Sequence, residues 1–296
     1  YSLDFTGSSP GTHVTDRCIL CYDDCLSDWE SVLVSSFPKR KRIHDGSIGM
    51  LLTYEASDGV VIQQPAIGVV MIAKTGEILC VVTQKTIKAP SGASLNLSGL
   101  MHIIVLEVLA RGNWTVVHAG GVSREGLCCL WTGPSGSGKT TRILELTSNG
   151  WQFYGDDLVL LRQSQNKEWE VWPLSKKIKP SIQTCKRIPQ LRQYAGIPTP
   201  TGEHTLKVDQ VFPVFRPTSG ILYTIHYMTL DDEPYMIRLK PQEAFERIGI
   251  CFLNYVSTHH AEHSIDTLHD IILKIPVYLV SRGWINAECG QAWERL

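Results

Sequence analysis

The segment Gly133–Thr140 reads G-P-S-G-S-G-K-T and fits the spacing G-x-x-x-x-G-K-[ST] at every fixed position. Glycines let several backbone N–H groups converge on one anion without steric conflict from Cβ atoms. The lysine of this pattern reaches the β- and γ-phosphates of a nucleotide, and the hydroxyl that follows it ligates Mg²⁺. The pattern therefore predicts a site for ATP and Mg²⁺, formed by Gly133, Pro134, Ser135, Gly136, Ser137, Gly138, Lys139, Thr140 and Thr141.

Two adjacent carboxylates, Asp156 and Asp157, follow Gly155 shortly after this loop. The run 151–154 before them predicts a strand. If this strand runs parallel to the strand predicted before the loop, its carboxyl end lies at the edge where open α/β sheets bind ligands. One carboxylate could then accept a proton from an attacking hydroxyl, and the other could hold Mg²⁺ through water. The alternative interpretation is a surface turn that binds nothing.

His118 closes the extended run 114–118 and precedes Ala119 and Gly120. A histidine at a strand end close to phosphates can donate a hydrogen bond to an oxygen or relay a proton. It is therefore a candidate catalytic residue, and the alternative is an ordinary polar strand end.

The elements that must position these residues fall into two parts. Residues 1–94 are predicted to form a β-rich N-terminal domain, and residues 95–296 a nucleotide-binding catalytic domain. In the first part, β-branched runs between turn residues predict strands at 50–54, 60–62, 68–73 and 77–83. In the second part, the predicted helices are 95–110, 139–148, 241–256 and 263–274, and the extended runs are 114–118, 127–131, 151–154, 158–161, 168–172, 211–215, 221–229 and 277–280.

The segment 11–37 has apolar residues at helical spacing and predicts a helix, although its part 17–22 also fits a short strand. Its cysteines Cys18, Cys21 and Cys25 are open to two interpretations. One is a metal or iron–sulfur site. The favoured one is a buried face of small apolar residues, because no fourth ligand stands at a recognisable spacing.

Composition excludes some classes of function. The net charge is −1 with histidine neutral, which gives no sign of the basic excess that marks a nucleic-acid-binding face. The basic run 39–42 is predicted to be a solvated connector. No run approaches the ~18 apolar residues that a membrane helix needs. With nine cysteines and no signal-peptide pattern, we expect reduced thiols, a cytoplasmic location, and neither a nucleic-acid nor a membrane partner.

The order of His118, the loop 133–140, Gly150 and the motif Gly-Asp-Asp at 155–157 resembles the catalytic domain of HPr kinase/phosphorylase. That family belongs with the ATP-dependent phosphoenolpyruvate carboxykinases, and the match is strongest over residues 114–162. The resemblance implies an α/β fold that lies outside the usual P-loop topology and is built around a mixed sheet.

The resemblance also implies roles for single residues. Asp156 would be the base that activates an acceptor hydroxyl, and Asp157 would support the metal site with Thr140. His118 and Lys139 would be catalytic, and the cofactors would be ATP and Mg²⁺.

The layout, with the β-rich portion 1–94 before a kinase-like core, is similar to HPr-kinase-like enzymes of modified-peptide clusters. In lasso-peptide clusters such enzymes phosphorylate a serine of the precursor peptide. The leading hypothesis is therefore a kinase that transfers the γ-phosphoryl group of ATP to a serine hydroxyl on a peptide or small protein. The alternatives are a small-molecule phosphotransferase or carboxykinase-like enzyme, and an ATP-binding regulatory module without activity. A homo-oligomer is a further expectation, because the parent family forms oligomers.

One group of residues is left without a role. The parent family's segment with a metal-binding glutamate is not recognisable after the aspartates, and basic residues stand in that region instead. They could attract phosphate or an acidic peptide, or form a solvated edge. They are Lys176, Lys177, Lys179, Lys186 and Arg187.

Overall fold

A computed structural model describes residues 18–22, 40–45, 49–56, 59–64, 68–73, 78–82, 104–197, 204–212, 219–252 and 258–286. Contacts between Cα atoms divide the chain into two compact units, 1–112 with 255–262 and 113–254 with 263–296. The domain boundary predicted between residues 94 and 95 lies outside the described residues.

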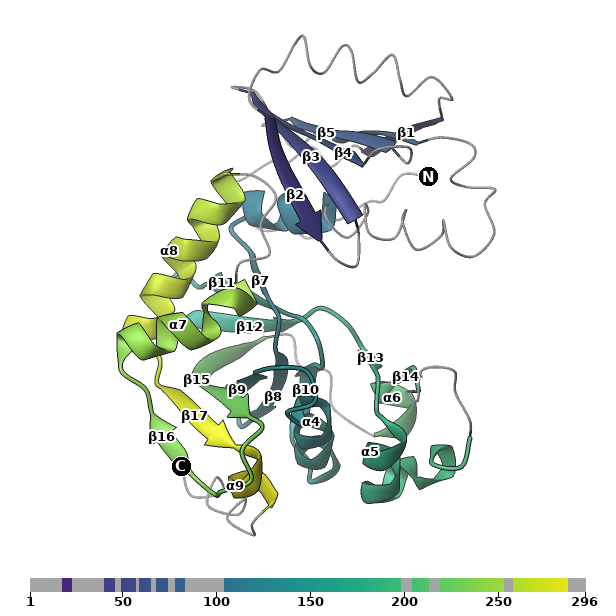
Figure 1. Cartoon of the computed structure of the whole chain (residues 1–296), viewed down its shortest axis with the longest axis vertical. Coiled ribbons are helices and arrows are strands. Elements are labelled where there is room, and N and C mark those ends of the chain that lie inside the picture. The colour runs from purple at the N-terminus through teal and green to yellow at the C-terminus, as the bar shows by residue number, and fades with distance from the viewer. Residues whose placement is uncertain are drawn as a thin grey trace. The chain divides into compact units, whose positions relative to one another are not determined.

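The first unit contains a six-stranded sheet with the order β1-β6-β5-β4-β3-β2 (Figure 1). Its strands from β2 to β6 form an antiparallel meander, and β1 adds to the end of it parallel to β6. The strands are β1 (Cys18–Tyr22), β2 (Arg40–Asp45), β3 (Gly49–Ala56), β4 (Gly59–Gln64), β5 (Gly68–Ala73) and β6 (Ile78–Val82). A small apolar core of Leu52, Tyr54, Val61 and Val69 stabilises this sheet.

For residues 17–22, the alternative of a short strand is confirmed at 18–22, because pairing with β6 outweighs the helical spacing of the apolar residues. Another expectation for this unit is wrong. The basic run from residue 40 on is not a connector, since Arg40–Asp45 pairs along its length with β3.

Cys25 lies outside the described residues, so the cysteine interpretations stay predictions. The predicted helix 95–110 is observed at residues 104–111.

The second unit is built on a nine-stranded mixed sheet with the order β10-β8-β9-β15-β12-β11-β7, in which β17 also pairs with β15 and β16 with β17. The mixed α/β class is confirmed. The strands are β7 (Thr115–Val117), β8 (Gly120–Arg124), β9 (Leu127–Thr132), β10 (Gln152–Gly155), β11 (Val159–Gln163), β12 (Trp169–Pro173), β15 (Gly220–Thr229), β16 (Met236–Arg238) and β17 (Val277–Ser281).

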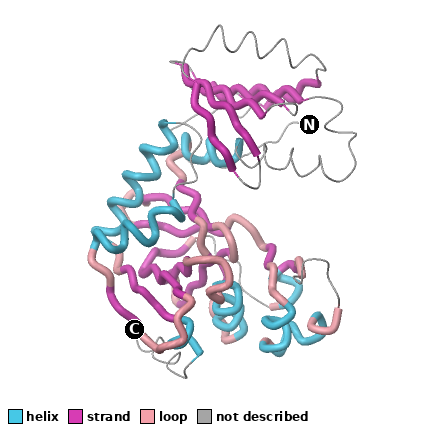
Figure 2. The backbone as a smooth tube through the Cα atoms, viewed as in Figure 1, coloured by secondary structure: helices cyan, strands magenta, loops and turns pink. Residues whose placement is uncertain are grey.

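Helices cover both faces of this sheet, as Figure 2 shows. Strand β9 illustrates the reason, because its buried side chains alternate between two cores. Cys128 and Leu130 pack with α7 (Pro241–Phe252) and α8 (Thr258–Lys274), whereas Cys129 and Trp131 pack with α4 (Lys139–Ser148). Burial on both faces fixes the position of β9, and with it the start of the loop that follows.

The chain between β12 and β15 forms a small substructure that the sequence did not predict. It contains β13 (Lys177–Ile178), α5 (Ile182–Arg187), the 3₁₀ helix η1 (Pro189–Tyr194), β14 (Leu206–Lys207) and α6 (Val208–Val211). Its buried side chains join the core that also contains those of α4. The predicted extended run 211–215 is wrong at its start, where Val211 ends α6; residues 213–218 lie outside the described residues.

Candidate active site

The loop and the two aspartates lie at one edge of the sheet. Strand β8 is antiparallel to β9 and also to β10, so β9 and β10 run in the same direction. Both carboxyl ends therefore reach the same edge, where the loop follows Thr132 and the acid pair follows Gly155. The condition that the two strands run parallel is therefore met, although β8 lies between them. Strand β8 itself was not predicted from the sequence.

The loop from Gly133 to Gly138 has the backbone that its glycines permit. Gly133 has a φ of +137°, and a Cβ atom there would lie 2.4 Å from the carbonyl oxygen of Met228 in β15. Gly138 is the N-cap of α4 with a left-handed φ of +98°. The loop thus rests directly on the β15 backbone and leads into the N-terminus of α4, a location that favours anions.

The contact of Gly133 predicts a large effect of one methyl group. Gly133→Ala should lower the free energy of unfolding by at least about 2 kcal/mol, because it adds a steric clash to a strained φ. Gly136→Ala is the matched control: its φ is +79°, but nothing lies within 4 Å of its Cβ position. Thermal melts of both variants measure the difference, and equal losses of stability would contradict the close packing on β15.

Lys139 folds back over the loop. Its Nζ donates hydrogen bonds to the carbonyl oxygens of Gly133, at 2.8 Å, and Pro134, at 3.0 Å. Burial lowers its pKa, while the charges of Asp157 and Asp156 act in the opposite direction. Phosphate oxygens would replace the two carbonyls as acceptors for the same ammonium group.

The two adjacent aspartates lie in different environments. Asp156 is 3% exposed, and burial raises its pKa to about 6 against the effects of the Thr140 hydroxyl and the Lys179 amide, which favour the charged form. That amide donates to Oδ2 of Asp156 at 3.3 Å. Asp157 is exposed, and its Oδ2 lies 3.7 Å from Nζ of Lys179. Asp156 is therefore held inside the edge and Asp157 faces outward.

The residues present fit a magnesium ion. Oδ1 of Asp156 is buried without a hydrogen-bond partner among the described residues, and the hydroxyl of Thr140 is close enough to affect its pKa. A hydroxyl and a carboxylate oxygen, with phosphate oxygens and waters, are the ligands that Mg²⁺ prefers. Oγ of Ser137 in the loop is also buried without a partner in the described part of the chain, and it could donate to a phosphate.

His118 stands beside these groups. Its carbonyl oxygen accepts a hydrogen bond from Oγ1 of Thr132, at 3.1 Å, directly before the loop. Burial lowers the pKa of its imidazole, the charge of Lys139 lowers it further, and the charge of Asp157 raises it. A Cβ atom at Gly120 would lie 3.1 Å from the Asp156 carbonyl oxygen. The glycine therefore allows the backbone that follows β7 to pack closely against the backbone that follows β10.

Not every predicted residue faces the same space. His118, Lys139, Thr140 and the acid pair come together as expected. Thr141 does not direct its side chain to the same place, because its Oγ1 lies 2.7 Å from Oγ1 of Thr184 in α5. Its hydroxyl therefore links two helices, and only its backbone N–H is left for a phosphate.

Two contacts of the site were missed from the sequence. Lys179 contacts both aspartates, but it was noted only as a member of a basic group. Cys251 also lies at the site, since its Sγ is 2.8 Å from Oγ1 of Thr132, the residue directly before the loop. Burial raises the pKa of the Cys251 thiol. No local pattern could have found Cys251, which follows Thr132 by 119 residues.

Comparisons with known proteins give a distant likeness. No protein-family profile and no curated protein matches the chain. Among solved structures, the HPr(Ser) kinase/phosphatase from Coxiella burnetii is similar with a TM-score of 0.33 and 14% sequence identity, over 60% of this chain and 98% of that chain. A likeness at this level carries no argument about activity. In the described part of the chain, no helix is long and apolar enough to cross a membrane.

Proposed function

We propose that this chain is an ATP-dependent phosphotransferase that phosphorylates a serine hydroxyl on a peptide or small protein, such as a lasso precursor peptide. One observation carries this proposal. The glycine-rich loop after β9 and the acid pair after β10 lie at the same edge of the sheet, and the acid pair is close enough to Lys139 to affect its pKa. A nucleotide-binding module without activity needs the loop and one carboxylate for Mg²⁺, but it has no use for a second, exposed carboxylate at the same edge.

The family resemblance implies that Asp156 is the base and that Asp157 supports the metal site. The environments of the two aspartates favour the opposite assignment. Asp156, buried beside Thr140 with Oδ1 unpaired among the described residues, is suited to hold Mg²⁺ directly or through water. Asp157, exposed and close enough to affect the pKa values of Lys139 and His118, is suited to accept the proton of an incoming hydroxyl. Bound Mg²⁺ would neutralise charge on the β- and γ-phosphates.

The chain's own residues divide the remaining work. Backbone N–H groups of the loop and Nζ of Lys139 would hold the β- and γ-phosphates in position for an in-line attack. His118, whose pKa is lowered, would be largely neutral at neutral pH and could donate one hydrogen bond to the transferring group. Asp157 would take the serine proton as the oxygen attacks the γ-phosphorus, and ADP would leave.

Transfer of label from γ-³²P-ATP tests this proposal. The protein with MgATP is offered serine peptides, free serine and oxaloacetate separately, and the products are identified by mass spectrometry. Label on a peptide serine is the expected result. Label on free serine alone, or a reaction with oxaloacetate alone, would favour the small-molecule alternative. Tight ATP binding with no ADP formed from any acceptor would favour the regulatory module.

The raised pKa of Asp156 predicts an effect on stability that does not depend on activity. Its pKa rises from 3.8 to about 6 on folding, so the buried carboxylate is destabilised in the native state wherever it is charged. Well below pH 4 both states are protonated and there is no effect. As pH rises from about 4, where the unfolded state deprotonates, to about 6, where the folded state does, the native state progressively loses about 3 kcal/mol, since each pH unit of the difference costs about 1.4 kcal/mol.

Asp156→Asn should remove this loss. The variant is therefore expected to be more stable than the wild type at pH 7.5, by up to about 3 kcal/mol, and at pH 4 by less than about 1 kcal/mol. Denaturant unfolding without metal or nucleotide at both pH values measures this, with Asp157→Asn as the exposed control. If Asp156→Asn changed the free energy of unfolding by the same amount at both pH values, this would contradict the raised pKa of the buried Asp156 carboxyl group.

A further inference from the structure

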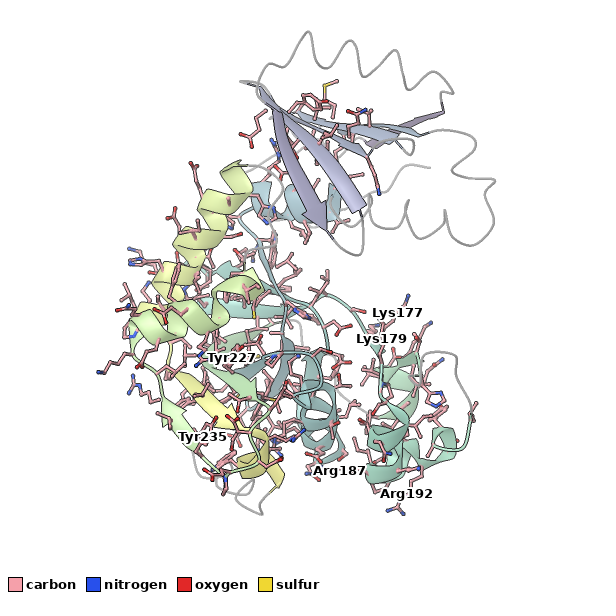
Figure 3. The ribbon with its side chains drawn as sticks, viewed as in Figure 1. Lys177, Lys179, Arg187, Arg192, Tyr227 and Tyr235 are labelled. Atoms are coloured by element: carbon pink, nitrogen blue, oxygen red, sulfur yellow. The ribbon has the colours of Figure 1, made fainter. Side chains whose placement is uncertain are left out.

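Basic side chains accumulate on the substructure that contains β13, α5 and η1. Residues 174–197 include six lysines and arginines and no aspartate or glutamate, in a chain whose net charge is −1. All six are exposed, and Figure 3 labels four of them along this part of the molecule. We call them the basic arm: Lys176, Lys177, Lys179, Lys186, Arg187 and Arg192.

The basic arm is fixed to the candidate active site. Lys179 contacts Asp156 through its amide and Asp157 through its ammonium group. Helix α5 is joined to the first turn of α4 by the hydrogen bond between Thr184 and Thr141, at 2.7 Å. The arm therefore starts at the acid pair and continues beside the helix that follows the phosphate loop.

Half of the arm's charge is not neutralised by the described residues. Lys176, Lys179 and Arg187 form ion pairs with Asp209, Asp157 and Glu145, respectively. No carboxylate among the described residues lies within ion-pair distance of the other three, which are Lys177, Lys186 and Arg192. Unneutralised positive side chains beside an acid pair attract anions by long-range electrostatics and direct them toward the site.

We propose that the basic arm binds an acidic segment of the acceptor peptide and so delivers its serine to the acid pair. This inference rests on the proposed function, and it adds the class of acceptor. The exposed Asp157 would otherwise repel an acidic peptide, and the ammonium group of Lys179 at 3.7 Å offsets that repulsion. A negatively charged flank next to the serine is therefore tolerated at the site and attracted by the arm.

The composition of the arm favours an acidic peptide over a nucleic acid. Surfaces for single-stranded nucleic acid combine cations with aromatic side chains on which bases stack. Between residues 174 and 197 the only aromatic residue is Tyr194, and it is partly buried with its ring 5.9 Å from that of His204. The arm thus offers charge without a stacking surface.

The test uses the full chain and two short fluorescein-labelled serine peptides of equal length. In one, glutamates and aspartates flank the serine; in the other, glutamines and asparagines replace them. Fluorescence anisotropy without nucleotide is expected to show binding of the acidic peptide at least about tenfold tighter than the neutral one at low salt, and this advantage should shrink as salt is added.

A triple charge reversal, Lys177→Glu with Lys186→Glu and Arg192→Glu, is expected to weaken binding of the acidic peptide at least about tenfold. The matched control reverses three exposed cations at the opposite ends of the strands, Arg124, Lys167 and Lys240, and should change binding less than about twofold. The triple glutamine variant at the arm should fall between wild type and reversal. Melting temperatures verify that each variant is folded.

Binding and transfer are measured separately, so that the two proposals fail in different ways. Equal binding of both peptides, undiminished binding by the triple reversal, or tighter binding of a single-stranded oligonucleotide of the same charge would overturn the acidic-acceptor inference. Transfer of label to both peptides with equal kcat/KM would overturn it as well and leave the kinase proposal intact. Specific binding of the acidic peptide without any transfer would support the arm and contradict the kinase.

Discussion

Replacing Asp157 by asparagine should slow phosphoryl transfer by about 10²–10⁴-fold, the usual contribution of a positioned general base. Asparagine keeps the size of the side chain but cannot accept the serine proton at neutral pH. The affinity for MgATP should change little, because Lys139, Thr140 and the loop are intact. Single-turnover transfer of label and a separate titration with a fluorescent ATP analogue measure the two effects.

Two controls make this result specific. Asp232→Asn removes an exposed carboxylate that pairs with Arg282, and it should leave the rate within about twofold. Asp156→Asn should raise the Mg²⁺ concentration needed for half-maximal rate. If Asp156→Asn instead slows transfer by about 10²–10⁴-fold with an unchanged Mg²⁺ requirement, while Asp157→Asn keeps its rate, the roles implied by the family resemblance are correct. Undiminished transfer in both variants would exclude a catalytic acid pair.

The same substitution has a spectroscopic consequence. The negative charge of Asp157 raises the pKa of His118, so Asp157→Asn should lower that pKa further below its ordinary value. An NMR titration of the His118 ring signals detects the change without nucleotide or acceptor. An unchanged His118 titration would show that the two side chains are not close enough to act together.

Lys139→Met should reduce the rate of transfer by about 10²–10³-fold, as expected for the loss of one preorganised donor to a developing charge. It should also weaken ATP binding, because its ammonium group is the cation that reaches the β- and γ-phosphates. Lys139→Arg is not expected to restore activity. The ammonium group fits between the carbonyl oxygens of Gly133 and Pro134 at 2.8 and 3.0 Å, and a planar guanidinium has a different shape.

His118 again provides an independent measurement. The charge of Lys139 lowers the pKa of His118, so Lys139→Met should raise it toward the ordinary value of 6.5, opposite to the effect of Asp157→Asn. Lys167→Met, in a turn at the far edge of the sheet, is the control and should leave the titration unchanged. Shifts of the same sign in the Lys139 and Asp157 variants would contradict the charge arrangement of the site.

Local signals in the sequence predicted the part of the site that depends on the backbone alone. The glycine-rich loop and the helix after it were assigned in full, and α4 covers residues 139–148 as predicted. This succeeded because the glycine positions and the Asn149–Gly150 stop act over a few residues, without help from the rest of the fold. The parallel course of β9 and β10 was only a condition of the prediction, and the pairing of both strands with β8 meets it.

Elements whose identity depends on pairing were less predictable. The apolar residues from 18 to 22 fit a helix by spacing, and the basic run 39–42 was predicted to be a solvated connector. Both are strands because neighbouring strands offer hydrogen bonds along their length. The substructure with β13, α5 and η1 had no strong periodicity, and it forms by packing short apolar segments into the core that also contains α4.

The sequence by itself determined that a phosphate-binding loop and an acid pair occur in this chain, because short-range backbone preferences fix the loop and the helix after it. The pairing of β9 and β10 with β8 decided that both reach the same edge of the sheet. Only the tertiary structure decided that Asp156 is buried beside Thr140 while Asp157 faces outward toward Lys179. Adjacent side chains leave a strand end in different directions, and what each one meets depends on segments that are distant in the sequence. For the same reason Lys179 and the basic arm could be recognised as part of the site only after folding.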